Sequence, residues 1–567
     1  MRTTRSKSRP KRCRTREEAR AAALKRTKKK FRQLLNSREF DFYLSSEAAV
    51  VAALIDSVWC SLEKFLSIPA REAARYKRHL RAILLNLYAA YVADPNRYVA
   101  LGLGKTSYSK RGRYSSLWAS HGITTKVLSA LRSKRIALLD MHSGMYDRVE
   151  EKGYRTRIRA TLTLAQKFKN AHLRPDMISR ASDYETVRLK DSDKTLIEYP
   201  DDANTITMRS NLALINTSLA ESYVGLHVSD ELRKGLDVAD RQLYRVFNDG
   251  SFERGGRFFG GWWQSIPSEL RRHIYVAHKY GQYPMPTREL DYSSMQPNLA
   301  YAMCGHAPPK DAYRIDVPKE RQDAFRPVCK AAMLRMLNTP SFVKAIESLK
   351  RWYGENELPD DVPAAGEMVR LIEVSNPVLL TQSMFYRKAG KQLMYLESCV
   401  AENVMLQMRA KGAIALPVHD SFLVMDSYSE YLVNSMKDAI RAETGFDIQI
   451  KLDLTEGEYG AKEKRERPGG VYGEIKRTNE ELEHAARAGA DSETLEEIAS
   501  TAKALRARSW AEEQESLKLE EIFRDDSQDR KECSVFWASF RSWLHGQPWY
   551  SAAEPSGDDL ADVAASA

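Results

Sequence analysis

Apolar residues recur at spacings of three and four along long stretches of the chain. Between Asp41 and Ala93 these stretches read AAVVAALIDSVWCSLEKFL and REAARYKRHLRAILLNLYAAYV, and this period is that of amphipathic helices. The pattern predicts two or three packed helices over residues 41–95. A similar stretch, MRSNLALINTSLAESYVGL (208–226), predicts a further helix within residues 176–250.

Residues 96–175 change from a helical pattern to an alternating one. Thr124 or Thr125 can cap a helix that runs through Arg132, after which IALLDMHSG and the basic YRTRIRATL flank a turn-rich stretch as a β-hairpin would. This order resembles a winged-helix domain, in which a helix enters the major groove and the hairpin contacts the DNA backbone. The resemblance implies DNA contacts by Lys126, Arg132, Arg135, Arg155, Arg157 and Arg159. The alternative is a small helical domain with a solvated basic hairpin.

Two acidic residues interrupt apolar patterns farther along the chain. ALPVHDSFLV (415–424) predicts a strand, a tight turn at His419 and Asp420, and a second strand. Upstream, TRELDYSSMQPNLAYAMCG predicts a short strand ending at Asp291 and a helix beginning near Pro297. Carboxylates at such strand ends can jointly bind two divalent cations, and hard oxygen ligands suit Mg²⁺, with Mn²⁺ as the alternative.

A basic helix is predicted between these two acidic residues. In AFRPVCKAAMLRMLNT (324–339), Arg326, Lys330 and Leu334 are spaced by four and share one helix face. The two cations can therefore grip phosphates together, whereas the plainer interpretation is a solvated helix face. The ordered set of Asp, Arg-x-x-x-Lys and His-Asp favours the phosphate interpretation over chance.

Composition and charge narrow the class of protein. The 567 residues are 43% hydrophobic, which suffices for several domains with packed cores. The sequence contains neither a run of eighteen apolar residues nor a secretory signal, so we expect no membrane association and a cytoplasmic protein encoded by a bacterium, plasmid or phage. Six widely separated cysteines are expected to be reduced and mostly buried.

The net charge of +12 favours a polyanionic partner. Lys and Arg dominate the first 33 residues, which predicts a disordered basic arm over residues 1–40, with a solubilising or targeting tail as the alternative. The chain after Tyr459 turns to Glu, Lys, Arg and Ala. This composition predicts a charged helical extension over residues 463–567 that ends in an acidic tail.

Four blocks in order resemble the motifs of family A DNA polymerases. DYSSMQ, RPVCK and VHDS are similar to that family's motifs A, B and C, and ERGGRFFGGWWQSIPSELRRHI, upstream of all three, is similar to its T-x-x-G-R and Q-N-I-P block. The resemblance implies an α+β right-hand fold: a palm with an antiparallel sheet and helical fingers over residues 251–462, and a thumb-like helical region over residues 176–250. It also implies template-directed DNA synthesis, with a primer-template and dNTPs as partners.

The resemblance assigns roles residue by residue. Asp291 and Asp420, with the carbonyl of Tyr292, would bind two Mg²⁺ ions. Arg326 and Lys330 would hold the triphosphate, Lys330 would protonate the leaving pyrophosphate, and Leu334 and Asn338 would lie beside the nucleotide. The implied DNA contacts are Arg257 and Gln264 in the minor groove, Arg271 and Arg272 on a basic helix, and His419 at the primer end.

Three positions depart from the DNA-polymerase pattern. Gln296 replaces the Glu that crowds a ribose 2′-hydroxyl, Asn338 replaces an aromatic residue, and motif C reads HDS. Single-subunit phage RNA polymerases also carry HDSF and a motif B close to RPVCK, so an RNA polymerase or primase that uses NTPs is an alternative. Another is a non-catalytic DNA-binding replication protein.

A further stretch imitates part of a proofreading site. Asp183-Tyr184-Glu185-Thr186 resembles the D-x-E-T start of the family's exonuclease, but the preceding ISRAS is not an apolar strand. We therefore interpret it as a surface loop and expect no proofreading.

Overall fold

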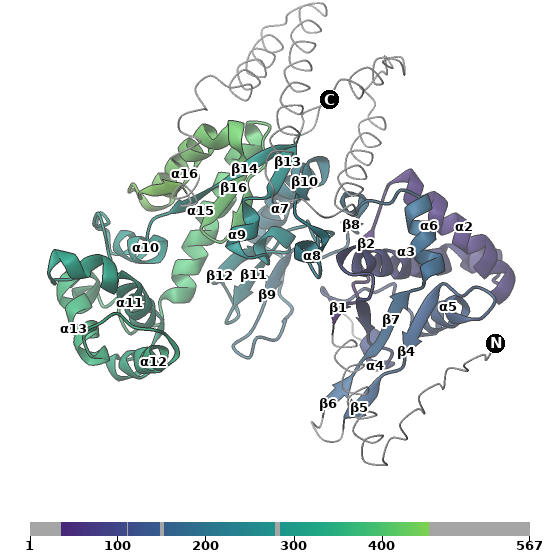
Figure 1. Ribbon diagram of the computed structural model, residues 1–567, viewed down its shortest axis with the longest axis horizontal. Helices are drawn as coiled ribbons and strands as arrows, with labels where there is room; N and C mark the ends of the chain where they lie inside the picture. Colours follow the sequence, from purple (N-terminus) through teal and green to yellow (C-terminus); the bar gives the residue numbers. More distant parts are fainter. Residues whose placement is uncertain (1–35, 110–111, 148–151, 278–283, 453–567) are drawn as a thin grey trace, which may run out of the picture. The chain divides into compact units, whose positions relative to one another are not determined.

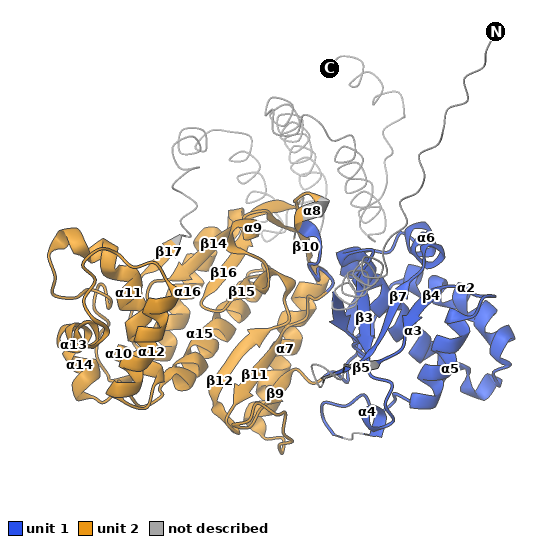
Figure 2. Cartoon of the chain, turned by 60° about the horizontal axis from the view of Figure 1, so that its bottom comes forward, with its two compact units in different colours: residues 1–184, 233–239 blue, residues 185–232, 240–567 orange. Residues whose placement is uncertain are grey.

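The computed structural model describes residues 36–109, 112–147, 152–277 and 284–452 (Figure 1). Almost all of the predicted basic arm and the whole of the predicted C-terminal extension lie outside these residues. The chain divides into two compact units, Met1–Tyr184 with Arg233–Ala239, and Glu185–Leu232 with Asp240–Ala567 (Figure 2). The described part mixes helix and sheet, which is consistent with the predicted α+β class.

The first unit packs helices against a four-stranded sheet. Its long helices are α2 (Ala49–Leu66), whose buried residues follow the predicted three-and-four spacing, and α3 (Ala70–Ala93), which is buried on nearly all sides between His79 and Ala90. The sheet has the order β1 (Ser37–Glu39), β3 (Tyr98–Leu101), β7 (Thr156–Ala160) and β4 (Leu139–His142). β1 is parallel to β3 and the other pairs are antiparallel. One apolar core therefore includes residues from both the 41–95 and the 96–175 ranges.

The predicted helix and hairpin of residues 96–175 are confirmed, with an earlier helix start. Helix α5 spans His121–Arg132, and β4 and β7 form the antiparallel pair that follows it. The prediction of a cap at Thr124 or Thr125 is wrong: Ser120 is the N-cap, and its hydroxyl accepts from the Ile123 amide. Both threonines lie inside the helix, where their hydroxyls donate to carbonyls four residues back.

Smaller elements complete the first unit. They are β2 (Leu44–Ser45), α4 (Thr106–Ser109), β5 (Met145–Asp147), β6 (Lys152–Tyr154), α6 (Leu162–Asn170) and β8 (Ser179–Arg180). The returning segment Arg233–Ala239 is fixed by Asp237, which pairs with Arg38 at 3.0 Å and Arg97 at 3.1 Å. Its Gly235 amide donates to the Ala93 carbonyl at 2.7 Å.

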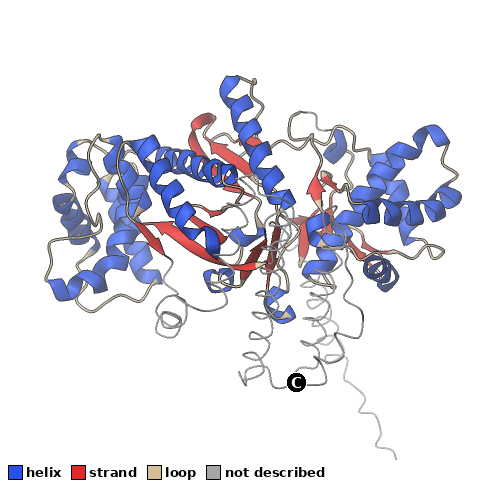
Figure 3. Ribbon diagram, turned by 90° about the horizontal axis from the view of Figure 1, so that it is seen from above, coloured by secondary structure: helices blue, strands red, loops and turns tan. Residues whose placement is uncertain are grey.

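The second unit contains the predicted antiparallel sheet. Its strands, in spatial order, are β10 (Tyr223–Leu226), β13 (Ile274–Ala277), β14 (Met285–Tyr292), β16 (Ser421–Met425) and β15 (Leu416–Val418), and β17 (Ile450–Leu452) also pairs with β14. All of these pairs are antiparallel. In Figure 3 the strands of this sheet stand out in red between blue helices.

A smaller sheet and a long helix support the larger one. β9 (Val187–Leu189), β11 (Tyr244–Asn248) and β12 (Ser251–Phe259) form the small sheet. Helix α15 (Gly390–Ala410) packs on β12, on α16 (Ser429–Thr444) and on α7 (Ala203–Glu221). The helix predicted through Leu226 ends at Glu221, because Tyr223–Leu226 pairs with β13 as strand β10.

Helices cluster around the predicted basic helix. That helix is α11 (Lys319–Asn338), and α12 (Phe342–Glu355) and α13 (Ala365–Ser375) pack against it. The shorter α10 (Met295–Met303) follows β14, and α9 (Ser268–Arg271) and α14 (Pro377–Thr381) are single turns. Within the described ranges, no helix combines the length and apolar character needed to cross a bilayer.

Candidate active site

Strands β14 and β16 bring the two predicted metal ligands together. Asp291 is the cross-strand partner of Ser421, and Asp420 is the residue that precedes Ser421 in the turn. The pairing therefore places Asp291 opposite the residue that follows Asp420, although 129 residues separate the two acidic residues (420 − 291). Both are half-buried.

The turn that carries Asp420 is the predicted tight hairpin. Val418 pairs with Ser421, so His419 and Asp420 alone form the bend. His419 has φ +61°, a left-handed conformation that hairpin turns usually give to Gly, Asn or Asp. A histidine held there is mildly strained, a feature that clusters at functional sites.

Asp291 and Asp420 have the donor chemistry that a hard divalent cation prefers. Two carboxylates supply hard oxygen ligands, and hydrated or phosphate-bound Mg²⁺ needs few protein ligands. Among the described residues, no group of three or more His, Cys, Asp and Glu side chains forms a closed metal cluster. The Tyr292 side chain is buried and donates to the Met436 carbonyl at 2.6 Å, so only its backbone can serve this site.

Helix α11 presents the predicted phosphate-binding residues. Arg326 pairs with Asp311 and lies 5.2 Å from the centre of the Tyr313 ring. Lys330, one turn farther along, is exposed. Burial raises the pKa of Tyr313 to about 12, with a contribution from the charge of Asp420. Tyr313 therefore lies within electrostatic reach of both the cationic helix and the acidic turn.

The remaining predicted nucleotide contacts on α11 lie beyond Lys330. Leu334 is half-buried, and Asn338 is exposed and donates to the Leu334 carbonyl at 2.7 Å. A Cβ on Gly390, the first residue of α15, would lie 1.7 Å from Asn338 Oδ1. Glycine at this position thus permits the start of α15 to approach the end of α11.

Arg257, predicted to contact the DNA minor groove, is paired within the protein. Its Nε and Nη2 each donate to a carboxylate oxygen of Glu397 at 2.7 Å. Glu397 lies on α15 with a side chain only 1% exposed. Burial raises the pKa of Glu397, opposed by Arg257 and Gln296. One buried carboxylate thus joins α15 and β12.

Gln264, the second predicted minor-groove residue, is bonded to three backbone groups. Its Nε2 donates to the carbonyls of Phe258 at 2.9 Å and Pro417 at 3.1 Å, and its Oε1 accepts from the Gly261 amide at 3.2 Å. Trp263 Nε1 donates to the same Pro417 carbonyl at 3.1 Å. Pro417 lies on the edge strand β15, where proline is tolerated because no partner strand needs its amide. The two side chains thus anchor the strand that leads to the acidic turn.

Arg271 is also paired within the protein, with a residue of the larger sheet. It makes a two-bond ion pair with Glu289 of β14, at 2.8 and 3.0 Å, and the Ser421 hydroxyl donates to the same carboxylate at 2.6 Å. Arg272, by contrast, is exposed. His419 is exposed in the turn, and its pKa is lowered first by partial desolvation and then by the charge of Arg257.

The basic residues predicted to bind DNA in the first unit fall into two groups. Lys126, Arg132 and Arg135 are exposed, the first two on α5. On the hairpin, Arg155 pairs with Glu39 and Arg159 pairs with Asp140 at 3.0 Å. Arg157 is half-buried, and one of its guanidinium nitrogens donates to the Arg155 carbonyl at 2.8 Å.

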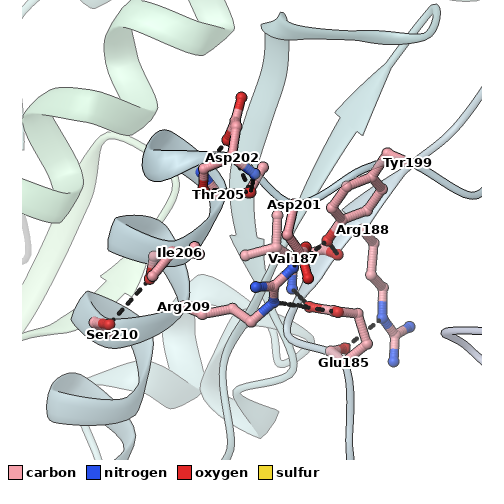
Figure 4. Close-up of polar contacts among 10 residues, drawn as sticks. All are labelled: Glu185, Val187, Arg188, Tyr199, Asp201, Asp202, Thr205, Ile206, Arg209 and Ser210. Carbon is pink, nitrogen blue, oxygen red and sulfur yellow. Dashed lines mark hydrogen bonds and ion pairs between the residues drawn. The ribbon is translucent and has the colours of Figure 1, made fainter.

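The two acidic residues of the exonuclease-like stretch have ion-pair partners in different units. Asp183 pairs with Arg78 at 3.3 Å in the first unit. In the second unit, Arg209 Nε lies 3.0 and 3.2 Å from the two carboxylate oxygens of Glu185, and the Val187 amide donates to Glu185 at 2.8 Å (Figure 4). Glu185 therefore links helix α7 to strand β9, which is a structural role.

Several residues that shape the site were missed by the sequence interpretation. Glu397 could have been found, because it shares the apolar face of its helix with Leu393, Val400 and Val404. A charged residue on such a face is buried only with a partner. Three others carry no comparable local signal, since their partners come from distant or irregular segments; they are Asp311, Glu289 and Trp263.

The chain matches no family model and no curated protein. Its function is therefore inferred from the chemistry and arrangement of these residues.

Proposed function

We propose that the chain is a template-directed nucleotidyltransferase, specifically a DNA polymerase of family A type without proofreading. The observation that carries the proposal is the register of β14 and β16, which opposes Asp291 to Ser421 and leaves Asp420 at the adjacent turn position. Two carboxylates held at neighbouring strand ends support a metal-assisted phosphoryl transfer. The cationic helix α11 in the same unit supports a triphosphate substrate.

In this proposal the side chains bind and orient the substrates. Asp291 and Asp420, with the Tyr292 carbonyl, would hold two Mg²⁺ ions, which would supply charge stabilisation for the reacting phosphate and hydroxyl. Arg326 exchanges its Asp311 partner for a phosphate oxygen, a contact in which guanidinium groups excel. Lys330, exposed one turn away, donates a proton to the leaving pyrophosphate.

The first unit is proposed to bind DNA as a winged-helix-like module. This proposal is supported by helix α5, which is followed directly by the antiparallel pair of β4 and β7. It is also supported by the exposed cations Lys126 and Arg132 on α5. A helix of this kind fits the major groove of DNA, so we expect the module to position the template.

The test is extension of a labelled primer in Mg²⁺ by the wild-type chain, Asp291→Ala and Asp420→Ala. Each substitution should lower incorporation by about a thousandfold or more, or about 4 kcal/mol of transition-state stabilisation, because one shared ligand is lost. DNA affinity, measured by fluorescence anisotropy, should stay within about twofold, since neither residue is part of the proposed cationic contacts.

Asp426→Ala is the matched control. Asp426 follows the far end of β16 and pairs with Arg288, so it lies about 20 Å from Asp420 along the strand, at about 3.3 Å per residue. The control should retain activity. Extension at the wild-type rate by either Asp291→Ala or Asp420→Ala would contradict the assigned ligands. Primer-independent use of NTPs would favour an RNA polymerase or primase, and DNA binding without any incorporation would favour a non-catalytic replication protein.

A further inference from the structure

Glu289 is a third carboxylate on the strand face that carries Asp291. It lies two residues before Asp291 on β14, and side chains two residues apart on a strand share a face. Asp291 pairs with Ser421 and Glu289 pairs with Leu423, so Ser421 belongs to the same face. The Glu289 side chain is only 8% exposed. Burying a carboxylate to this degree is costly unless its charge is paired and its oxygens are bonded.

Two partners satisfy the Glu289 carboxylate. The Arg271 guanidinium donates two hydrogen bonds to it, from Nε to Oε2 at 2.8 Å and from Nη2 to Oε1 at 3.0 Å. The Ser421 hydroxyl donates a third, to Oε1 at 2.6 Å. This hydroxyl also lies 3.1 Å from the Val418 carbonyl. It has only one proton, however, and the shorter bond to the charged acceptor is the stronger of the two.

Ser421 connects this ion pair to the acidic turn. It follows Asp420 directly, and its pairing with Val418 closes the two-residue bend. Leu423 lies opposite Glu289, so the bond from Ser421 to Glu289 runs diagonally between the two strands, a distance that a long side chain can span. One carboxylate of β14 thus holds the residue next to Asp420.

Glu289 does not add a third ligand to the candidate metal site. Its charge is already paired with Arg271. In the part of the chain that the structure describes, no three His, Cys, Asp or Glu side chains are grouped so as to hold a metal ion. Residues that orient metal ligands without touching the metal nevertheless change metal affinity or activity by about 10- to 100-fold when they are replaced.

We propose that Glu289, braced by Arg271, is a positioning residue that holds the Asp420 turn through Ser421 and thereby sets the affinity of the site for divalent cations. The inference rests on the proposed function, in which Asp291 and Asp420 bind the metal. The turn needs such support because its bend consists of only two residues, and Asp420 is one of them.

The experiment measures Mn²⁺ binding to the full chain by electron paramagnetic resonance, with neither DNA nor nucleotide present. Mn²⁺ prefers the same oxygen ligands as Mg²⁺. Ser421→Ala removes the hydroxyl and leaves the ion pair of Glu289 and Arg271 intact. We expect the Kd for Mn²⁺ to rise by about tenfold. The Mg²⁺ concentration for half-maximal primer extension should rise in parallel, whereas the rate at saturating Mg²⁺ should change less, because excess cation fills the weakened site.

Ser398→Ala is the matched control. Ser398 is buried, as Ser421 is, and lies in the same unit. Its hydroxyl accepts from Arg245 Nη2 at 2.8 Å and donates to the Tyr395 carbonyl at 2.7 Å. The control therefore also removes a buried hydroxyl bonded to a charged group, but on α15 and not beside Asp420. Its Kd for Mn²⁺ should stay within about twofold of the wild-type value.

Glu289→Gln tests the carboxylate itself. The side chain keeps its size, but one acceptor oxygen becomes an NH₂ group, which cannot accept from Arg271 or Ser421. The Kd for Mn²⁺ should again rise. Adding Ser421→Ala should then have a smaller effect than it has in the wild type, because the two residues act through one network. If Glu289→Gln does not fold, Ser421→Ala decides the test, since it leaves no buried charge without its partner.

Three results would overturn the inference and leave the proposed function in place. These are an unchanged Kd for Mn²⁺ in Ser421→Ala, an equal rise in Ser398→Ala, and a Ser421→Ala effect that persists in full on the Glu289→Gln background. A different result would refute the proposed function, and the inference with it. This is a wild-type chain that extends no primer and binds Mn²⁺ no more tightly than Asp291→Ala and Asp420→Ala do.

Discussion

Replacing Gln264 separates a DNA-contacting role from a role in holding the hairpin that carries Asp420. Gln264→Met keeps the length of the side chain and removes its donor and acceptor atoms. Three hydrogen bonds to backbone groups are lost, at 2.9, 3.1 and 3.2 Å. Each contributes about 1 kcal/mol net, but the Pro417 carbonyl keeps its bond from Trp263. The free energy of unfolding should therefore fall by about 2 to 3 kcal/mol.

Urea unfolding monitored by circular dichroism measures this loss. With a urea m-value of about 2 to 3 kcal/mol/M, the midpoint should fall by about 1 M. Primer extension should slow because the strand leading to Asp420 is less well fixed, whereas DNA affinity by anisotropy should stay within about twofold. Gln407→Met is the control: Gln407 is also half-buried but, among the described residues, makes one side-chain bond, to Asn403 at 3.0 Å, so its cost should be about 1 kcal/mol or less.

The opposite pattern would refute the reasoning. If Gln264→Met unfolds at the wild-type urea midpoint and binds DNA many times more weakly, Gln264 serves the nucleic acid and not the hairpin.

Two further predictions concern the first unit. Burial lowers the pKa of His79, whose ring accepts a hydrogen bond from the Ser120 amide at 2.9 Å. The unfolded chain therefore binds a proton at this residue more readily than the folded chain, so the free energy of unfolding should fall as pH drops below about 6.5. Urea midpoints at pH 7.5 and 5.5 should differ less in His79→Gln than in the wild type, and equal differences would contradict this assignment. Charge reversal of Lys126 and Arg132 together should weaken DNA binding and reduce the log–log salt slope by up to about 1.8, at about 0.9 per phosphate contact. An unchanged slope would show that α5 does not touch the phosphates.

The local parts of the second unit could be predicted from the sequence. Two apolar runs around a polar pair predict the hairpin at His419 and Asp420. A strand pattern followed by turn-forming residues likewise predicts the strand that ends near Asp291. Both are confirmed. The end of α7 was placed too far along because Tyr223–Leu226 continues the apolar pattern. Only pairing with β13 makes that segment a strand, and pairing of this kind is not visible locally.

The partners of the arginines could not be predicted. Arg257 and Glu397 are 140 residues apart. The identity of a basic residue in a motif does not show whether its partner is a phosphate or a buried carboxylate. The partner of such a residue depends on how the two sheets pack with α15. A pair of adjacent glycines contributes to this packing. Gly256 has φ +79°, and a Cβ there would lie 2.6 Å from Ser398 Oγ, so glycine lets β12 approach the helix.

The chain leaves the first unit at Tyr184, returns for Arg233–Ala239 and leaves again. No single cut can therefore release both units intact. A fragment ending at Tyr184 would lack Asp237, and Arg38, whose side chain is 6% exposed, would lose the carboxylate that pairs with it. A fragment starting at Glu185 would instead carry Arg233–Ala239 as a loop without its docking site. Truncation and separate-expression experiments, and domain swaps, should treat Arg233–Ala239 as part of the first unit. During synthesis, the first unit is complete only when the ribosome has added 55 residues after Tyr184 (239 − 184).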